Sequence, residues 1–266
     1  MAIELSDQLL NLPIVAPSYR FPPYRYNHIR RLTIVAESDI DSVRRFVPEP
    51  LECVGNRFLF WIEHRVDEDP SPTPHAFTHP FDTYEAAVEI PVRFRGTLGN
   101  YIPMMWVPVS EAEFARALAG RELQGLGKKL ARFHWDERLL DDEIVARLTR
   151  NNVDLADVKV KLTGEAVELP KNSRIIGIKM IPRIDGKGYD VHKVVALEQW
   201  KIKTIASKGG RVESLNIGSS EEDPLARLRP TRVHGALFTI WSGETLQPCG
   251  RDLADLLAES ARPAKA

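Results

Sequence analysis

The sequence predicts an α+β, mostly β fold: one antiparallel, barrel-like sheet with a few short helices. Nineteen prolines against 16 glycines argue against long helices and favour strands that end in turns. Apolar and polar residues alternate from Val158 to Thr163, which is typical of a half-buried strand with one wet face. A sheet curled into a barrel leaves few strand edges unpaired, so we expect this architecture.

Two short helices are expected in the first half of the chain. The segment Asp39–Val47 is amphipathic at helical spacing, with Ser38 or Asp39 as its N-cap. Ser110–Glu113 matches a capping box, and the helix that it begins should end before Gly120.

The apolar segments between these helices and beyond them should be strands, and a third helix should close the chain over 252–259. The expected strands cover 31–36, 56–66, 84–94, 101–107, 158–163, 174–181, 191–205, 211–217 and 233–241. Glycines between 84–94 and 101–107 predict a hairpin. The segment 67–74 is rich in Asp and Pro, so we expect a loop there.

Composition describes an ordinary globular protein and excludes several classes. The chain is 43% hydrophobic and 27% charged, and no apolar run approaches the ~18 residues of a membrane span. The formal net charge is 36 − 37 = −1, without the basic excess that nucleic acid binding demands. An acidic start and only two cysteines predict a cytoplasmic protein.

We expect one domain over residues 1–266, because no linker or shift in composition interrupts the chain. Residues 1–23 should form an extended N-terminal arm, since prolines near its end disfavour helical geometry in the residues before them. Residues 260–266 should be a flexible tail.

The segment Gly120–Leu130 carries the strongest chemical signal, with three glycines and two adjacent lysines. A P-loop would need Lys directly after its second glycine and then a hydroxyl, and this segment has neither. Adjacent lysines after a glycine turn are most often solvated. However, Lys128 lies between the apolar Leu126 and Leu130. An amine attacks carbonyls only when it is neutral, and burial disfavours the ammonium form, so Lys128 is a candidate nucleophile.

Several pieces taken together resemble the acetoacetate decarboxylase family, over about Tyr24 to Leu246. They are Val47–Leu51, Glu85 with Pro91–Val92, Tyr101–Met105, Gly120–Leu123 with Lys128–Leu130, and Lys179–Pro182 with Asp185–Gly186. The resemblance implies a barrel-like single domain, a homo-oligomer and no cofactor. It also implies that Lys128 is the Schiff-base lysine, Lys129 its cationic neighbour and Glu85 the acid-base glutamate. Activation of a lysine by desolvation or by a nearby cation is known from this family itself.

Two positions depart from the family pattern. Decarboxylases place an arginine before the first strand to hold the substrate carboxylate, and an ungapped alignment puts Ile29 there. Arg30 is one step away and should face the other side of an extended chain. A second family glutamate falls at Trp61, with Glu63 two residues on and on the same face. The pocket should then be wider, more aromatic and short of one carboxylate clamp.

Three further residues are candidates for binding the substrate. Gln124 resembles the family branches that form a Schiff base with a 2-oxo acid for aldol or dehydration chemistry, although an exposed loop amide is an equal alternative. Arg121 has the charge to hold a carboxylate, and a structural ion pair with Glu122 is the commoner role. Trp241 is a candidate for the pocket mouth, while core packing is the commoner role.

These residues predict a cofactor-free lyase that condenses Lys128 with a small ketone or 2-oxo acid. Aldol condensation and dehydration of pyruvate with an aldehyde is preferred over decarboxylation of acetoacetate or a related β-keto acid, because of Ile29 and Gln124. A non-catalytic barrel that carries a small molecule remains a third alternative. No metal is expected, since His75-x-x-x-His79 sits in a proline-rich loop and no other histidine pair has ligand spacing.

Overall fold

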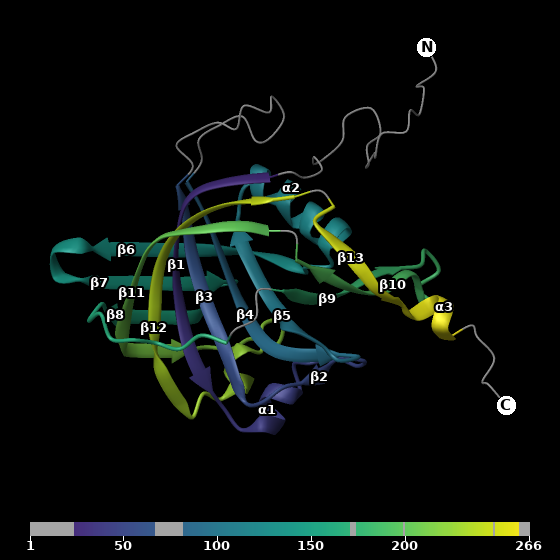
Figure 1. Cartoon of the computed structure of the whole chain (residues 1–266), viewed down its shortest axis with the longest axis horizontal. Coiled ribbons are helices and arrows are strands. Elements are labelled where there is room, and N and C mark those ends of the chain that lie inside the picture. The colour runs from purple at the N-terminus through teal and green to yellow at the C-terminus, as the bar shows by residue number, and fades with distance from the viewer. Residues whose placement is uncertain (1–23, 67–81, 171–173, 199, 247, 261–266) are drawn as a thin grey trace, which may run out of the picture.

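The computed structural model describes residues 24–66, 82–170, 174–198, 200–246 and 248–260. The described chain is mostly β with three short α-helices, which confirms the predicted fold class (Figure 1). The predicted N-terminal arm, the loop at 67–74, His75 and His79, and nearly all of the predicted tail lie outside the described residues. Within them, no helix is long and apolar enough to cross a membrane.

Hydrogen bonding joins nine strands into a closed ring, in the order β5-β6-β7-β8-β11-β12-β1-β3-β4 with β4 pairing back to β5. All neighbours in this ring are antiparallel except β5 and β6. The strands are β1 (Tyr24–Glu37), β3 (Arg57–Val66), β4 (Asp82–Phe94), β5 (Thr97–Pro108), β6 (Lys128–Arg138), β7 (Glu143–Arg150), β8 (Val153–Lys161), β11 (Trp200–Ile217) and β12 (Arg232–Thr245).

Four more strands extend the sheet beyond the ring. β9 (Ile175–Pro182), β10 (Tyr189–Leu197) and β13 (Gly250–Asp255) continue from β5, and β2 (Glu52–Cys53) pairs with β4. In Figure 1 the first three project sideways from the barrel and end near the C-terminus. The expected strand over 191–205 is therefore two strands, since β10 ends at Leu197 and β11 begins at Trp200.

The expected helix over 252–259 is wrong in its first half. Residues Gly250–Asp255 form β13, which pairs with β10, and the helix α3 covers only Leu256–Ser260. Asp255 marks the change, because its carboxylate accepts hydrogen bonds from the backbone N–H groups of Leu257 and Ala258. A free helix N-terminus needs such an acceptor, so the helix begins only there.

The two other helices match their predicted starts. Helix α1 (Ile40–Arg44) is capped by Asp39, whose Oδ1 accepts from Ser42 N at 2.7 Å. Ahead of α2 (Glu111–Ala119), Ser110 Oγ accepts from Glu113 N at 3.2 Å, which is half of a capping box. Helical geometry does not end with α2 at Ala119, however. It continues through a π-helical turn, η1 (Gly120–Gln124), while η2 (Leu139–Asp141) and η3 (Leu225–Leu228) are 3₁₀ turns.

Alternation along the strands separates a packed interior from an outer face. Phe58, Phe60 and Ile62 of β3 join one large buried cluster with inward residues of the other ring strands, so this cluster fills the barrel. The residues between them point outward. A smaller apolar cluster on this outer face contains Trp61, Ala87, Met105, Leu126 and Leu197. The outer face of β1, β3 and β4 is therefore where charged side chains can gather beside apolar ones.

Candidate active site

The glycines of the 120–130 segment bring the backbone close to other groups. A Cβ on Gly120 would lie 2.9 Å from Lys128 Cε, so only glycine lets the chain pass this side chain without displacing it. Gly125 has φ 72°, and a Cβ there would lie 3.0 Å from the Cα of Lys179 in β9. The α-helix ends at Ala119, directly before Gly120, as predicted. Gly120 also allows the chain to approach Lys128 closely, which was not predicted.

Lys128 begins β6 beside Met105, because β5 and β6 are parallel and these two residues are in register. Its side chain is 9% exposed, and Nζ donates to Glu85 Oε1 at 2.6 Å. Glu85, from the outer face of β4, is 2% exposed. The structure thus brings together the predicted nucleophile and the predicted acid-base group, which are 43 residues apart in sequence.

A chain of ion pairs continues from Glu85 across the outer face. The second oxygen of Glu85 binds Arg65, and Arg65 Nε donates to Glu63 Oε1 at 2.6 Å. Glu63 Oε2 accepts from Arg31 Nε at 2.7 Å. The strand register explains the row, since Glu63 lies directly opposite Arg31 on β1 and Glu85 on β4. The row places the guanidinium groups of Arg31 and Arg65 on the same face as Lys128, beside the carboxylates of Glu63 and Glu85.

Arg65 keeps its charge although its side chain is only 12% exposed. Burial acts to lower the pKa of its guanidinium, but the nearby carboxylates of Glu63 and Glu85 outweigh burial, so the pKa is raised. The guanidinium also lies 5.1 Å from the ring centroid of Tyr26. Arg65 is therefore a cation that binds the Glu85 oxygen that Lys128 does not contact.

The two candidate tryptophans lie against the far end of this network. The guanidinium carbon of Arg31 is 4.2 Å from the ring centroid of Trp61 and 5.4 Å from that of Trp241. Trp61 Nε1 also donates to Glu89 Oε1 at 2.6 Å. Both rings are buried, so they pack in the protein and at the same time border a charged site. Trp61 and Glu63 share one face, as predicted.

Sequence reasoning missed Arg31 and Arg65. Arg30 faces the other side of β1 and lies 3.6 Å from Glu137, so the structure does not bring it to Lys128. Arg31 is two residues beyond Ile29 and therefore on the same face, and Arg65 stands in the same relation to Glu63. Strand alternation applied to these arginines was the signal that was available.

Lys129 lies on the opposite side of β6 from Lys128. Its Nζ is 3.0 Å from Asp223 Oδ1 and also donates to the carbonyl of Glu222. Asp223 is also bound by Arg150 at 2.7 Å and by Trp106 Nε1 at 3.1 Å. Burial acts to raise the pKa of Asp223, but the hydrogen bonds from Lys129, Arg150 and Trp106 outweigh it, so the pKa is lowered. The structure does not bring Lys129 to the amine of Lys128.

Gln124 and Arg121 have different surroundings. Gln124 is buried at the end of η1, and its side chain acts to lower the pKa of the Cys249 thiol. Burial raises the pKa of that thiol, with partial offsets that include Gln124. Arg121 is exposed. Within the described residues, no hydrogen bond or ion pair joins Gln124 or Arg121 to Lys128, so their roles in substrate binding stay predictions.

Among the described residues, no group of three or more His, Cys, Asp or Glu side chains is placed to hold a metal ion.

Comparisons with known proteins agree on one family. The sequence model described as acetoacetate decarboxylase (ADC) matches residues 11–247. A protein named acetoacetate decarboxylase 2, from Mesorhizobium japonicum, is 27% identical over 237 residues, which cover 86% of this chain and 83% of that protein.

Solved structures show the same fold at lower identity. An acetoacetate decarboxylase structure superposes with a TM-score of 0.77 at 22% identity, over 94% of this chain and 97% of the other. The enduracididine biosynthesis enzyme MppR, complexed with the condensation product of pyruvate and imidazole 4-carboxaldehyde, superposes with a TM-score of 0.73 at 18% identity, over 92% of this chain and 96% of MppR.

Proposed function

This chain belongs to the acetoacetate decarboxylase family, and from that premise we propose that it is a lyase whose Lys128 forms a Schiff base with a small keto acid. The observation that carries the proposal is the contact of 2.6 Å between Lys128 Nζ and Glu85 Oε1, with both side chains almost fully buried. A shielded amine beside a carboxylate has a nucleophile and a proton acceptor within hydrogen-bond reach.

The first step is attack of the Lys128 nitrogen on the substrate carbonyl carbon. Glu85 accepts a proton from the attacking nitrogen and returns it to the former carbonyl oxygen, which gives a carbinolamine. A second proton, taken up from solvent, lets that oxygen leave as water, and the product is a positively charged iminium. The iminium then withdraws electrons from the neighbouring carbon. Arg65 holds one oxygen of Glu85, so the other oxygen stays directed at the reacting nitrogen.

Decarboxylation of a β-keto acid is the reaction that we place first. In acetoacetate the bond to the carboxylate breaks, carbon dioxide leaves, and the electron pair forms an enamine. Protonation at carbon and hydrolysis then release the ketone and Lys128. Our preference for aldol chemistry depended partly on Ile29 at the expected clamp position. Arg31, paired with Glu63 and lying against two tryptophans, supplies a cation on the outer face and supports decarboxylation.

Aldol condensation and dehydration of pyruvate is the second candidate. Here the iminium loses a methyl proton, the enamine attacks an aldehyde, and water leaves to give a conjugated product. The buried amide of Gln124 and the aromatic surface of Trp61 and Trp241 support this alternative. MppR, which shares the fold, is described with a condensation product of pyruvate and an aldehyde.

Three incubations separate these reactions. The protein is mixed with acetoacetate, with pyruvate, or with pyruvate and benzaldehyde; borohydride is added to part of each sample, and intact mass, carbon dioxide and ultraviolet absorbance are measured. We expect a reduced adduct that disappears in Lys128→Ala, together with carbon dioxide from acetoacetate.

Other outcomes would change the proposal in defined ways. A conjugated product from pyruvate and benzaldehyde, without carbon dioxide from acetoacetate, would reverse the order of the two reactions. In that case Gln124→Ala should weaken pyruvate binding by the ~1.5–3 kcal/mol of a hydrogen bond to a charged group. No adduct with any carbonyl compound would contradict the Schiff base and favour a small-molecule carrier.

A further inference from the structure

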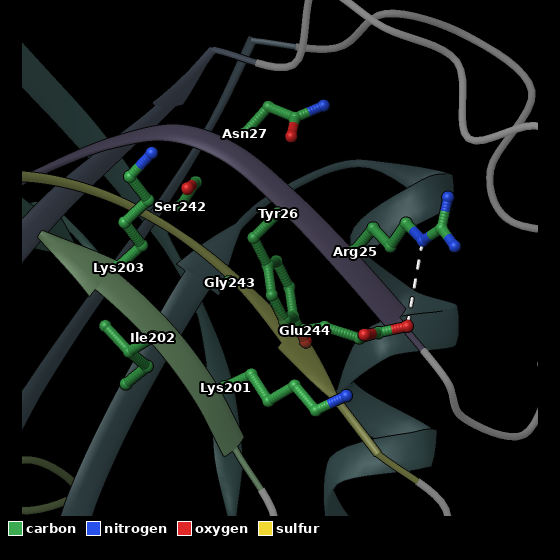
Figure 2. A pocket seen from close by; sticks show the side chains of 9 residues that line it. All are labelled: Arg25, Tyr26, Asn27, Lys201, Ile202, Lys203, Ser242, Gly243 and Glu244. Atoms are coloured by element: carbon green, nitrogen blue, oxygen red, sulfur yellow. Dashed lines mark ion pairs between the residues drawn. The ribbon is translucent and has the colours of Figure 1, made fainter. Parts of the chain in front are cut away.

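We infer that a second pocket, at the ends of β1, β11 and β12, binds a small organic polyanion such as a phosphate ester or a tricarboxylate. The pocket has a volume of about 640 Å³, within the usual range for small-molecule sites. Figure 2 shows its side chains arriving from three neighbouring strands, with Tyr26 near the centre.

An irregularity in β1 shapes this pocket. Tyr26 is paired with Gly243 and Ile29 with Trp241, so two residues of β1, Asn27 and His28, stand opposite one residue of β12. His28 has φ 46°, in the left-handed region that non-glycine residues seldom adopt. Such a bulge bends a strand and redirects its side chains. It leaves Asn27 lining the pocket together with Ser242, whose hydroxyl can donate a hydrogen bond.

The charges in the pocket do not balance. Arg25 and Glu244 lie 3.7 Å apart and offset each other. Lys201 and Lys203 also line the pocket, and no ion pair joins either of them to another residue in the described ranges. The two lysines are alternate residues of β11, and Figure 2 shows their side chains extending in different directions. The pocket therefore holds two uncompensated positive charges.

Some other lysines of the sheet are paired with carboxylates. Lys208, further along β11, is bound to Asp142 at 2.7 Å, and Lys193 of β10 is bound to Asp252 at 2.6 Å. The sheet thus compensates these lysines from neighbouring segments but leaves the pair in the pocket uncompensated. A ligand with two or more negatively charged groups would attract both of these flexible lysine side chains, and the hydroxyl of Ser242 would help to orient it.

Tyr26 gives the pocket a spectroscopic reporter. Its ring centroid is 6.2 Å from that of Trp241. A ligand that moves Tyr26 should alter the surroundings of Trp241, and tryptophan fluorescence responds to such changes. Binding can therefore be followed without measuring any catalytic activity.

The test titrates the full chain with pyrophosphate and, separately, with citrate at low ionic strength, by calorimetry and tryptophan fluorescence. We expect saturable binding of at least one probe, and the stronger probe tells whether phosphate or carboxylate groups are preferred. The double variant Lys201→Gln/Lys203→Gln should bind at least about tenfold more weakly, because it loses both free charges. The control Lys187→Gln/Lys208→Gln removes two charges elsewhere and should stay within about twofold of the original.

Two results would overturn the inference. Equal affinity of the two double variants would mean that the anion responds only to overall charge, and an absence of saturable binding for both probes would mean that the pocket holds no such ligand. Loss of binding in Lys128→Ala would also overturn it, since the anion would then occupy the candidate active site. Unchanged binding in Lys128→Ala supports a separate site.

Discussion

Lys128 and Lys129 are adjacent in sequence and lie in two different electrostatic environments. Lys129 has two acceptors, Asp223 and the carbonyl of Glu222, and Asp223 is itself bound by Arg150. Within the described residues, Lys128 Nζ has a single acceptor, Glu85, which it shares with Arg65.

This difference supports a structural role for Lys129 and the proposed nucleophilic role of Lys128. Lys128 Nζ has one acceptor in the protein and can form further hydrogen bonds to a substrate, whereas Lys129 Nζ already has two acceptors. Each lysine's environment is decided by its position in β6, because neighbouring residues of a strand point to opposite faces. Cationic charge on Lys129 therefore acts on the protein's stability rather than directly on the Lys128 amine.

Replacing each lysine in turn should give the largest contrast. Lys128→Ala should lower turnover of the substrate by at least about 10³-fold, the scale at which loss of a covalent nucleophile is felt. Lys129→Ala should keep turnover within about tenfold and instead lower the free energy of unfolding by about 1–2 kcal/mol, because Lys129 is 37% exposed and Arg150 remains. Steady-state kinetics and urea unfolding measure both. Equal loss of turnover in the two variants would contradict the division of roles.

Glu85 should show the next largest effect. Glu85→Gln should slow turnover by about 10²–10⁴-fold, since a positioned acid-base group is lost while the shape of the side chain is kept. Borohydride trapping should still detect some adduct on Lys128. The control Glu137→Gln removes a carboxylate that pairs with Arg30 on the other face, and its turnover should change little. Unchanged turnover in Glu85→Gln would remove Glu85 from the mechanism.

The environment of Lys129 should show itself in the pH dependence of stability. The folded pKa of Asp223 is below its usual 3.8, so its carboxylate stabilises the fold above that pH, and this contribution is lost as the pH falls through the folded pKa. Asp223→Asn should therefore cost about 2–3 kcal/mol near pH 7. The difference between the two proteins should shrink below about pH 4. A difference that stays constant down to pH 2.5 would contradict the assignment.

Sequence patterns predicted the barrel because the signals were local. Alternation such as Val158 to Thr163 identified strands, and the caps at Asp39 and Ser110 identified helix starts. The pairing of β4 with β5, which closes the ring, is the hairpin that two glycines predicted. Strand β7 was missed because arginines and a threonine interrupt its apolar residues, although Ile144, Ala146 and Leu148 alternate inward.

The site was predicted only in part because it depends on contacts between distant strands. The resemblance to a family identified Lys128 and Glu85, whose contact joins β4 to β6. It assigned the carboxylate clamp by an ungapped alignment, and the structure offers Arg31 two residues further on. Strand alternation places Arg65 on the same face as Glu63, but its contact with Glu85 could not be predicted locally, since Glu63 and Glu85 meet only when β3 and β4 pair in register. The end of α2 before Gly120 was predicted correctly, but the close approach of Gly120 to Lys128 was not, because it is also a tertiary contact.

Tyr26 offers the smallest and most selective way to disturb the Lys128 environment. Its ring lies 5.1 Å from the Arg65 guanidinium, and its hydroxyl accepts a hydrogen bond from Thr245 Oγ1 at 3.3 Å. Cation–π contacts contribute about 0.5–2 kcal/mol, so Tyr26→Leu should lower kcat/KM by about three- to tenfold through looser positioning of Arg65 and Glu85.

The conservative variant separates positioning from simple loss of packing. Tyr26→Phe keeps the ring and loses only the hydroxyl, so it should restore most of kcat/KM, whereas a role centred on the bond to Thr245 would leave Phe as impaired as Leu. Both variants should still give the borohydride adduct, because Tyr26 is connected to Lys128 indirectly, through Arg65 and Glu85. Turnover is measured without polyanionic buffers, since Tyr26 also lines the second pocket. If kcat/KM is unchanged in Tyr26→Leu, Arg65 is held by its two carboxylates alone.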